Sequence, residues 1–418
     1  EAAAAGRQPD RSVDRARAGV MGATLFLAHR VPYPPDRGDK IRGWHLLRHM
    51  AARGPVHLVT FADDARDLRH DAVLDNVCAS HHVAWRGKPQ WRAGLEALAS
   101  GQPVSLAAFA DTGVAARVRE LLARGGIDTI FVFSGQMAQY LPGDTVARVV
   151  MDFCDVDSAK FASYARTAGP PMGWVMAREA RLLGAFEYDV AARVDASLFV
   201  SDAEAALFRA GGPAPRVSVV ENGIDTAFFD PAAAFDRGAA TPGLTFTGQM
   251  DYAPNIEAAC WFAREVMPRL AERGIDLPFN IVGRAPTKVV QALAGPRVRV
   301  TGEVADVRPW LAAAPVVVAP LLTARGVQNK VLEAMAMARP IVASTVAAEG
   351  IEHRGTLSVA ADADAFTDRI AALLADRDTA AAQGRAARAC VEDRYGWAAR
   401  LAALDAILDR PAAKRIAA

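Results

Sequence analysis

The sequence predicts an α/β protein of two domains, each built on a parallel β-sheet with helices on both faces. Short β-rich apolar runs alternate with longer Ala/Leu/Arg-rich segments of helical periodicity. The alternation restarts in the middle of the chain, and 418 residues are enough for about two or three domains. A hydrophobic fraction of 52% with 23% charged residues is ordinary for a folded protein.

Buried parallel strands read as nearly continuous apolar runs. In the first half, the expected strands are Thr24–Ala28, Val56–Phe61, Ile130–Phe133, Val149–Met151 and Ala196–Val200. In the second half, they are Val217–Val220, Leu244–Thr247, Phe279–Val282, Val298–Thr301, Val316–Ala319 and Ile341–Ala343. Amphipathic helices are expected at Ile41–Ala52, Ala115–Ala123, Ile256–Ala271 and Ala365–Leu374.

A change of composition near residue 222 marks the domain boundary. Glu221–Asp225 follows a strand, and a Pro/Ala/Gly-rich stretch leads to a new strand that ends at Gly248. We expect a flexible extension at 1–20, a first domain at 21–222, a second at 223–395, and a last segment at 396–418. The helix Trp397–Leu408 in that last segment would cross back to the first domain. Strands that point toward a shared central cleft would bind ligands at their carboxyl ends.

Composition excludes several classes of protein. A net charge of +1 argues against a nucleic-acid partner. Four widely spaced cysteines exclude a zinc ribbon and a disulfide framework, and they fit a reducing compartment. No apolar run is long enough to span a bilayer. The run Ala18–Ala28 resembles a short signal sequence, and the alternative that we prefer is a buried first strand at Ala23–Ala28. We therefore expect a cytoplasmic protein.

The strongest motif is a strand, a loop and a helix in the second domain. Val316–Pro320 is the strand, and the helix opens at Asn329. A helix N-terminus offers free N–H groups and partial positive charge, which suit a phosphate. Arg325 and Lys330 can neutralise the charge of a diphosphate, and Gly326 permits the diphosphate to approach the backbone closely. The Glu333 carboxylate can accept hydrogen bonds from the two hydroxyls of a ribose. The alternative is an ordinary crossover helix whose Lys and Glu face water.

This stretch resembles the donor site of family 4 glycosyltransferases of the GT-B fold. Glu333 matches the second glutamate of their E-x7-E motif, and Arg325 stands at the first position. The resemblance implies two Rossmann-like domains that face a central cleft, and a C-terminal helix that crosses back to the first. It also implies that the UDP- or GDP-sugar donor contacts a set of residues in this loop and helix. These residues are Arg325, Gly326, Val327, Gln328, Asn329, Lys330 and Glu333.

Further segments are similar to other elements of that family. Glu221–Asp225 resembles its hinge, and Phe246–Met250 resembles the glycine-ended first strand of its donor domain. Gln249 follows Gly248 at the position where many relatives carry an arginine that binds the diphosphate. The resemblance therefore implies that Lys330 and Arg325 neutralise the diphosphate here. Val300–Val304 resembles a later strand end, which implies that Gly302 and Val304 flank the nucleobase.

Two segments of the first domain resemble one particular subgroup of these glycosyltransferases. His29–Lys40 and Met151–Lys160 are similar to the sugar transferases associated with the PEP-CTERM/exosortase system of Gram-negative bacteria. The resemblance implies that Gly38 and Lys40 approach the donor phosphates or the acceptor; the alternative is a rigid turn stiffened by prolines. Cys154 stands where many relatives carry a sugar-contacting histidine.

Aspartates in the second of these segments are candidates for acid–base chemistry. Asp152, Asp155 and Asp157 could orient an acceptor hydroxyl or act as base, and we select Asp155. The alternative is that Asp152 caps a helix and that Asp157-Ser158 begin one. Asp155-Val156-Asp157 also spells D-x-D, the metal motif of the other large glycosyltransferase fold. The two-domain pattern contradicts that role, so we expect no metal and no cofactor besides the donor.

The segment Trp85–Arg92 interleaves tryptophans with cations. It suits a surface that meets a polyprenyl-diphosphate-linked acceptor at an anionic bilayer, which implies peripheral contact with the inner membrane. The alternative is a solvated loop with both tryptophans in the core.

The resemblance implies a retaining transferase that moves a hexose to a glycan or lipid-linked acceptor in exopolysaccharide synthesis. Catalysis would rest on positioning and on stabilising the departing diphosphate through Lys330 and Arg325, with Asp155 on the acceptor side. Two alternatives remain open. One is a sugar-nucleotide 2-epimerase, and the other is a non-catalytic subunit that binds nucleotide-sugars.

Overall fold

The computed structural model describes residues 22–35, 37–214, 216–236, 238, 240–324 and 327–410. The chain divides into two compact units, which are considered separately. Unit 1 comprises the residues up to Asn222 together with those from Leu401 onward, and unit 2 is Gly223–Arg400. Among the described helices, none combines the length and the apolarity needed to cross a membrane.

Unit 1 contains a seven-stranded sheet in the order β3-β2-β1-β4-β5-β6-β7. All of its neighbouring strands pair in parallel. Its strands are β1 (Ala23–Ala28), β2 (Val56–Ala62), β3 (Ser80–Trp85), β4 (Ile127–Phe133), β5 (Arg148–Cys154), β6 (Ala196–Phe199) and β7 (Val217–Val219). The two halves of the sheet diverge from the central pair β1 and β4, as in a doubly wound fold.

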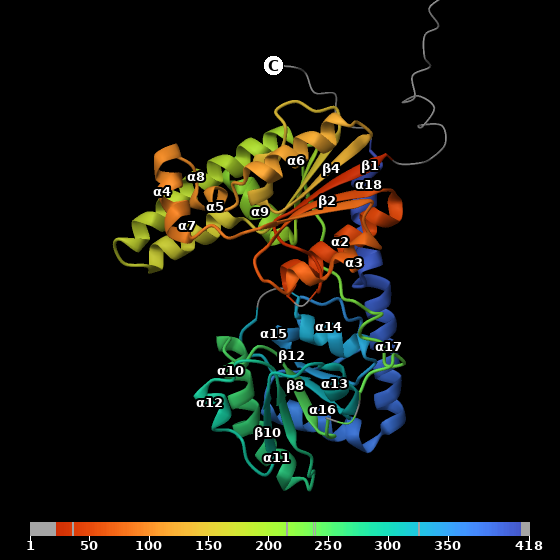
Figure 1. The fold of residues 1–418 in the computed structure, drawn as a ribbon. Coiled ribbons are helices and arrows are strands. Elements are labelled where there is room, and N and C mark those ends of the chain that lie inside the picture. Colours follow the sequence, from red (N-terminus) through yellow and green to blue (C-terminus); the bar gives the residue numbers. More distant parts are fainter. Residues whose placement is uncertain are drawn as a thin grey trace, which may run out of the picture. The chain divides into compact units, whose positions relative to one another are not determined.

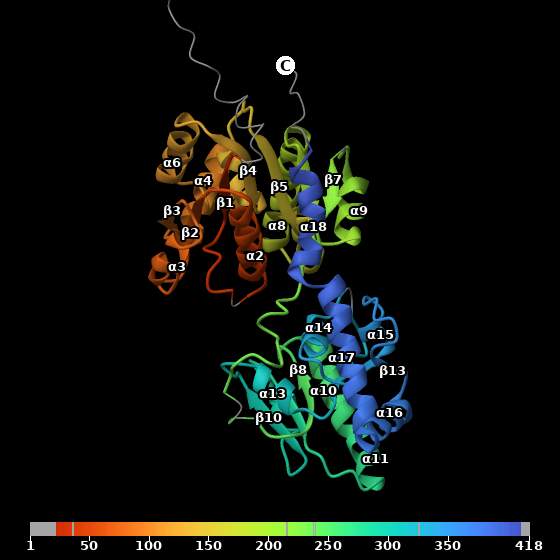
Figure 2. The same ribbon diagram turned by 90° about the vertical axis from the view of Figure 1, so that its right-hand side faces the viewer.

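Helices cover both faces of this sheet (Figure 2). One face packs against α6, α8 and α9, and the other lies behind α2 and α18. The helices of unit 1 are α2 (Gly38–Arg53), α3 (Asp71–Asp75), α4 (Gln90–Ser100), α5 (Val104–Ala107), α6 (Thr112–Ala123), α7 (Asp157–Thr167), α8 (Met172–Arg193) and α9 (Asp202–Gly211), with 3-10 turns at η1 (Asp67–Arg69) and η2 (Gly135–Tyr140).

Unit 2 repeats this architecture with a six-stranded parallel sheet in the order β10-β9-β8-β11-β12-β13. Its strands are β8 (Leu244–Thr247), β9 (Phe279–Val282), β10 (Val298–Gly302), β11 (Val317–Ala319), β12 (Ile341–Ser344) and β13 (Ser358–Ala360). The helices and one π-turn of unit 2 are α10 (Ala253–Trp261), η3 (Phe262–Val266), α11 (Met267–Glu272), α12 (Lys288–Gln291), α13 (Arg308–Ala313), α14 (Asn329–Ala336), α15 (Thr345–Ala348), α16 (Ala363–Ala375) and α17 (Arg377–Arg394), labelled in part in Figure 1. Helix α18 (Trp397–Leu408) is shared between the two units.

These two sheets confirm the predicted fold class of two Rossmann-like parallel-sheet halves. Two strands that the sequence did not predict, β3 and β13, lie at sheet edges. β3 reads Ser-His-His-Val-Ala-Trp and is only half-buried, because an edge strand has a neighbour on one side only. The helix expected at Ile256–Ala271 is interrupted by the π-turn η3, which joins α10 to α11.

Helix α18 begins in unit 2 and ends in unit 1, because the division falls between Arg400 and Leu401. Within unit 1, Leu401, Leu404 and Leu408 are buried. The Asp405 carboxylate accepts a hydrogen bond from His49 Nε2 at 2.8 Å and pairs with Arg53, and both of these residues lie on α2. Apolar burial and ion pairs therefore hold the end of α18 beside α2.

Candidate functional site

The carboxyl edge of the unit 2 sheet carries glycines where three neighbouring strands end. Gly248 follows β8, Gly283 follows β9, and Gly302 ends β10. A Cβ atom on Gly283 would lie 1.7 Å from the Gly248 carbonyl oxygen, so only glycine fits there. Gly302 has a φ of +71°, which other residues adopt at a cost. Glycine is therefore required where the ends of β8 and β9 pack closely and where β10 ends in a left-handed conformation.

Helix α14 starts at the same edge, one residue after Gln328, whose side chain does not cap it. Val327 and Gln328 are half-buried and Asn329 is exposed. The loop before them is anchored by Ser344 at the end of β12, whose hydroxyl donates to the Leu321 carbonyl at 2.6 Å. Arg325 and Gly326, which the sequence analysis assigned to the diphosphate, lie outside the described residues.

Lys330 lies in the first turn of α14 and reaches back to the end of β8. Its ammonium donates to Asn255 Oδ1 and lies 4.8 Å from the centroid of the Phe246 ring. Asn255 is 4% exposed, and its Nδ2 donates to the Gln249 carbonyl at 2.8 Å. A Cβ atom on Gly248 would lie 3.3 Å from Lys330 Nζ, so the glycine leaves room for this cation. The structure thus brings Gly248 and Lys330 together, as a shared site requires.

The charges of Lys330 and Glu333 are weakly compensated. Burial lowers the pKa of Lys330 to about 8, against the opposing charge of Glu333. Burial also raises the pKa of Glu333 to about 7, against the charge of Lys330. No other group among the described residues offsets the burial of either one, although Asn255 accepts from Lys330. Perturbed pKa values of this kind gather at functional sites.

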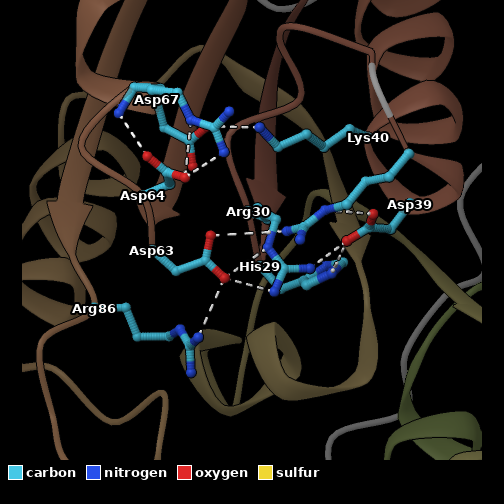
Figure 3. A network of polar contacts seen from close by, with 10 residues as sticks. His29, Arg30, Asp39, Lys40, Asp63, Asp64, Asp67 and Arg86 are labelled. Carbon is cyan, nitrogen blue, oxygen red and sulfur yellow. Dashed lines mark hydrogen bonds and ion pairs between the residues drawn. The ribbon is translucent and has the colours of Figure 1, made fainter. Parts of the chain in front are cut away.

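A denser network of charges lies at the carboxyl ends of β1 and β2 in unit 1 (Figure 3). Arg30 donates to Asp63 Oδ2 at 2.6 and 2.9 Å and also to Asp39, in the first turn of α2. Asp39 lies 3.4 Å from His29 Nε2 as well. Burial alone would raise the pKa of Asp39, but His29, Arg30 and Arg37 hold it well below its usual range. Arg86 adds a contact of 3.2 Å to Asp63.

Two further cations of α2 are buried in ion pairs. Lys40 is 5% exposed and its Nζ lies 2.6 Å from Asp67 Oδ1. Figure 3 shows it turned toward that carboxylate. Arg42 is 1% exposed and donates to both oxygens of Asp152 at 2.8 and 3.1 Å and to Asn222 Oδ1 at 2.9 Å. Both cations are thus neutralised inside the protein.

The other predicted residues of unit 1 are more accessible. A Cβ atom on Gly38, which begins α2, would meet nothing within 4 Å. Asp155 is exposed and follows Cys154, which ends β5 with a φ of +67°. Burial raises the pKa of the Asp155 carboxyl, and the neighbouring Glu204 and Asp157 carboxylates add to that rise.

Two carboxylates from other helices hold the segment that carries Asp155. Glu204 of α9 accepts from the Val156 amide at 2.7 Å, and Glu187 of α8 accepts from the Ser158 amide at 3.1 Å. Burial raises the pKa of Glu187 to about 7, although its hydrogen bonds with Ser158 oppose that rise. Asp155 thus follows a fixed backbone, and its own side chain is partly exposed and partly desolvated. Within the described ranges, no three His, Cys, Asp or Glu side chains are grouped to hold a metal ion.

Three partners of the site residues were missed by the sequence analysis: Asn255, Asp67 and Asn222. Asn255 follows Pro254 at the start of α10, a position that gives no sign of a bond to Lys330. Asp67 lies 27 residues from its partner Lys40, and Asn222 lies 180 residues from Arg42. No local spacing could have revealed these contacts.

Comparison with known proteins bears on the half that carries Lys330 and Glu333. Residues 241–376 match the sequence model of a family described as glycosyl transferases, group 1. That match covers the sheet of unit 2 and helix α14. No curated protein matches the chain.

Solved structures match along nearly the whole chain. HepE of Anabaena, in complex with UDP and glucose, is 16% identical with a TM-score of 0.58, and the match covers 93% of this chain and 99% of that one. The chain has the GT-B fold. The same GT-B architecture matches the sucrose-phosphate synthase of Thermosynechococcus elongatus, at 18% identity and a TM-score of 0.59 over 93% and 98% of the two chains. WaaG, a glycosyltransferase involved in lipopolysaccharide biosynthesis, matches at 16% identity and a TM-score of 0.56 over 93% and 100%.

Proposed function

We propose that this GT-B protein is a retaining glycosyltransferase of family 4 type, which moves a hexose from UDP- or GDP-hexose to an acceptor hydroxyl. The observation that carries the proposal is the Lys330–Glu333 pair, which lies within the segment that matches group 1 glycosyl transferases. Solved structures of HepE hold UDP, UDP-glucose, and UDP with glucose. A nucleoside diphosphate-sugar is therefore the donor class we infer.

The donor would bind along the carboxyl edge of the unit 2 sheet. Lys330, the N-terminus of α14 and Arg325 would face the diphosphate, since a helix N-terminus favours an anion. Glu333, once ionised, would accept hydrogen bonds from the two ribose hydroxyls. Gly302 and Val304 would flank the base. In this arrangement the diphosphate replaces Asn255 as the partner of Lys330, and the ribose supplies the hydrogen bonds that Glu333 lacks.

In the transfer step, the bond between the sugar C1 and the diphosphate oxygen breaks, and the acceptor oxygen bonds to C1 on the same face. The acceptor proton passes to the departing diphosphate or to Asp155, whose raised pKa makes it a better base than an ordinary aspartate. Lys330 and Arg325 stabilise the charge that develops on the leaving group.

We infer that the acceptor is a glycan or a polyprenyl-diphosphate-linked intermediate of bacterial exopolysaccharide synthesis. This rests on the segments His29–Lys40 and Met151–Lys160, which are similar to the transferases of the PEP-CTERM/exosortase system. Such an acceptor fits a cytoplasmic enzyme that works at the surface of the inner membrane.

Calorimetry with UDP and GDP tests the donor site. Glu333→Ala should weaken binding of the preferred nucleotide by about 2 kcal/mol, or roughly 30-fold, because charged hydrogen bonds to the ribose are lost. The matched control is Glu272→Ala, which changes an exposed glutamate of α11 and should leave the affinity unchanged. Equal affinities for Glu333→Ala and the unmodified protein would refute the ribose assignment.

Turnover with a panel of nucleotide-sugars tests the reaction. Slow hydrolysis or transfer is expected, and Lys330→Ala should lower turnover about 100-fold, more than it weakens binding. The exposed Lys288, changed to Ala, is the control. Release of a free 2-epimer would instead identify an epimerase, and binding without turnover for any acceptor would identify a non-catalytic subunit.

The transfer activity should persist when EDTA is added. Loss of activity in EDTA would indicate a metal held by the D-x-D aspartates, Asp155 and Asp157.

A further inference from the structure

Helix α4 presents its large apolar side chains to solvent. Ala93 and Ala97 are fully buried, whereas Trp91, Leu95 and Leu98 are 68%, 59% and 66% exposed. Positions i, i+4 and i+7 lie on one face of a helix, so these three side chains form a continuous outer stripe. An ordinary surface helix buries such residues and exposes the small ones. The alternative in which Trp85 and Trp91 lie in the core is wrong, since Trp85 is 52% exposed as well.

The start of helix α8 is similarly exposed. Met172, Trp174 and Val175 are 51%, 73% and 46% exposed. The turn that carries them is compact, because a Cβ atom on Gly173 would lie 2.6 Å from the Ala168 carbonyl oxygen. These apolar side chains therefore project from a folded turn.

A hydrogen-bonded contact joins the two helices. Arg178 of α8 donates to the Ala97 carbonyl at 2.9 Å, at the end of α4, and to the Gln102 carbonyl at 3.1 Å. Trp174 lies one helical turn before Arg178 and hence on the same face of α8. Figure 1 shows α4, α5, α7 and α8 grouped at one end of unit 1. We use the name apolar patch for Trp91, Leu95, Leu98, Met172, Trp174 and Val175.

The charged side chains around the apolar patch are predominantly positive. Arg92, Arg166 and Arg181 are exposed. In α4 and in residues 161–182 the sequence has only two carboxylates, Glu96 and Glu179. Glu96 accepts from Lys88 at 2.7 Å and from Arg92 at 3.0 Å. Glu179 is buried and accepts from the amides of Val104 and Ser105. The surface around the apolar patch is therefore cationic.

We propose that the apolar patch docks on the surface of an anionic lipid bilayer. Tryptophans and leucines that project from folded elements can enter the boundary between headgroups and acyl chains, and the surrounding arginines can meet anionic headgroups. Large exposed apolar side chains gathered on two adjoining helices are typical of a surface that binds a partner or a membrane. The cationic rim favours a lipid surface over a second copy of the chain, whose identical rim would repel it. This docking deepens the proposed work at the inner-membrane surface, and its test measures lipid binding, which does not require sugar transfer.

Flotation of the full chain with vesicles tests the proposal. The protein should float with phosphatidylcholine vesicles that contain about a third phosphatidylglycerol, and less with phosphatidylcholine alone, and added salt should weaken the binding. The combined changes Trp91→Gln, Leu95→Gln and Trp174→Gln should weaken binding about tenfold or more. The changes Arg166→Gln and Arg181→Gln should reduce only the part of the binding that depends on anionic lipid.

The matched control changes three exposed apolar residues of unit 1 outside the apolar patch: Leu68, Val146 and Leu207, each to Gln. This variant should bind vesicles like the unmodified protein. Circular dichroism should show all variants folded, since every changed side chain is exposed. The proposal is overturned if the unmodified protein does not float, or if the control loses as much binding as the patch variant. It is also overturned if the patch variant abolishes self-association in sedimentation without any loss of vesicle binding.

Discussion

The carboxyl edges of the two sheets carry similar residue types in different electrostatic states. In unit 1, Arg42 and Lys40 are each buried against a carboxylate, and Arg30 bridges two. In unit 2, Lys330 has an amide oxygen as its hydrogen-bond partner, and the Glu333 carboxylate receives no hydrogen bond from the described residues. The pKa values of both residues move toward neutrality. Pairing in unit 1 neutralises its cations within the protein. The uncompensated charges in unit 2 are what a charged ligand can satisfy.

The largest effect should come from breaking a pair in unit 1. Arg42→Ala leaves Asp152, which is 0% exposed, as a buried charge without its ion-pair partner. We expect a loss of about 3–5 kcal/mol in the free energy of unfolding of unit 1, measured by urea denaturation. Because two apolar side chains need no partner, Arg42→Met combined with Asp152→Leu should recover most of that loss.

Arg92→Ala is the control for this prediction. It removes an exposed pair with Glu96 and should cost less than about 1 kcal/mol. If Arg42→Ala cost no more than this control, the buried pair would not be what stabilises the edge of unit 1.

A smaller effect should follow from placing a carboxylate beside Lys330 of unit 2, as carboxylates lie beside the buried cations of unit 1. Asn255→Asp places a carboxylate against Lys330, which should raise the pKa of Lys330 above about 8. The new carboxylate should compete with the diphosphate for the ammonium and repel it, so calorimetry at neutral pH should show about tenfold weaker UDP or GDP binding. Gln291→Glu, which adds the same charge on an exposed residue of α12, should leave the affinity unchanged. Equal losses in the two variants would assign the effect to net charge alone.

The smallest effect concerns how the free energy of unfolding depends on pH. Burial raises the pKa of Glu333 from 4.5 to about 7, so the folded state prefers the protonated form and loses stability as pH rises from about 4.5 to 7. Glu333→Gln removes this term. The variant should match the unmodified protein near pH 4 and should be more stable at pH 8 in urea denaturation, because the unmodified protein then carries a buried carboxylate. A constant difference across this range would show that the carboxylate does not titrate there.

Sequence patterns located the central strands and two of the four edge strands, β7 and β10. Leu244–Thr247 and Phe279–Val282 were predicted with their observed bounds, because strands buried on both faces are continuous apolar runs. β3 and β13 were missed, since edge strands contain polar residues wherever they meet solvent. The start of α14 at Asn329 and the whole of α18 were also predicted as observed.

The candidate site could be predicted only where its residues are close in sequence. Lys330 and Glu333 were placed on the first turns of one helix by spacing alone. The contacts of Lys330 with Asn255, and of Arg42 with Asp152, join residues 75 and 110 positions apart. Which cation is buried and which stays available depends on these distant partners. Lys40 looked available by its position next to a glycine-containing loop, and the fold pairs it with Asp67.

The path of α18 affects the order in which the protein can assemble on the ribosome. Unit 2 is one continuous stretch, Gly223–Arg400, so its core can close once that stretch has emerged. Unit 1 must wait for the end of α18, which lies over its sheet beside α2 (Figure 2) and whose Leu401, Leu404 and Leu408 are buried. The half synthesised first is thus completed last. Until then, the uncovered strands of unit 1 expose apolar surface that a chaperone could bind.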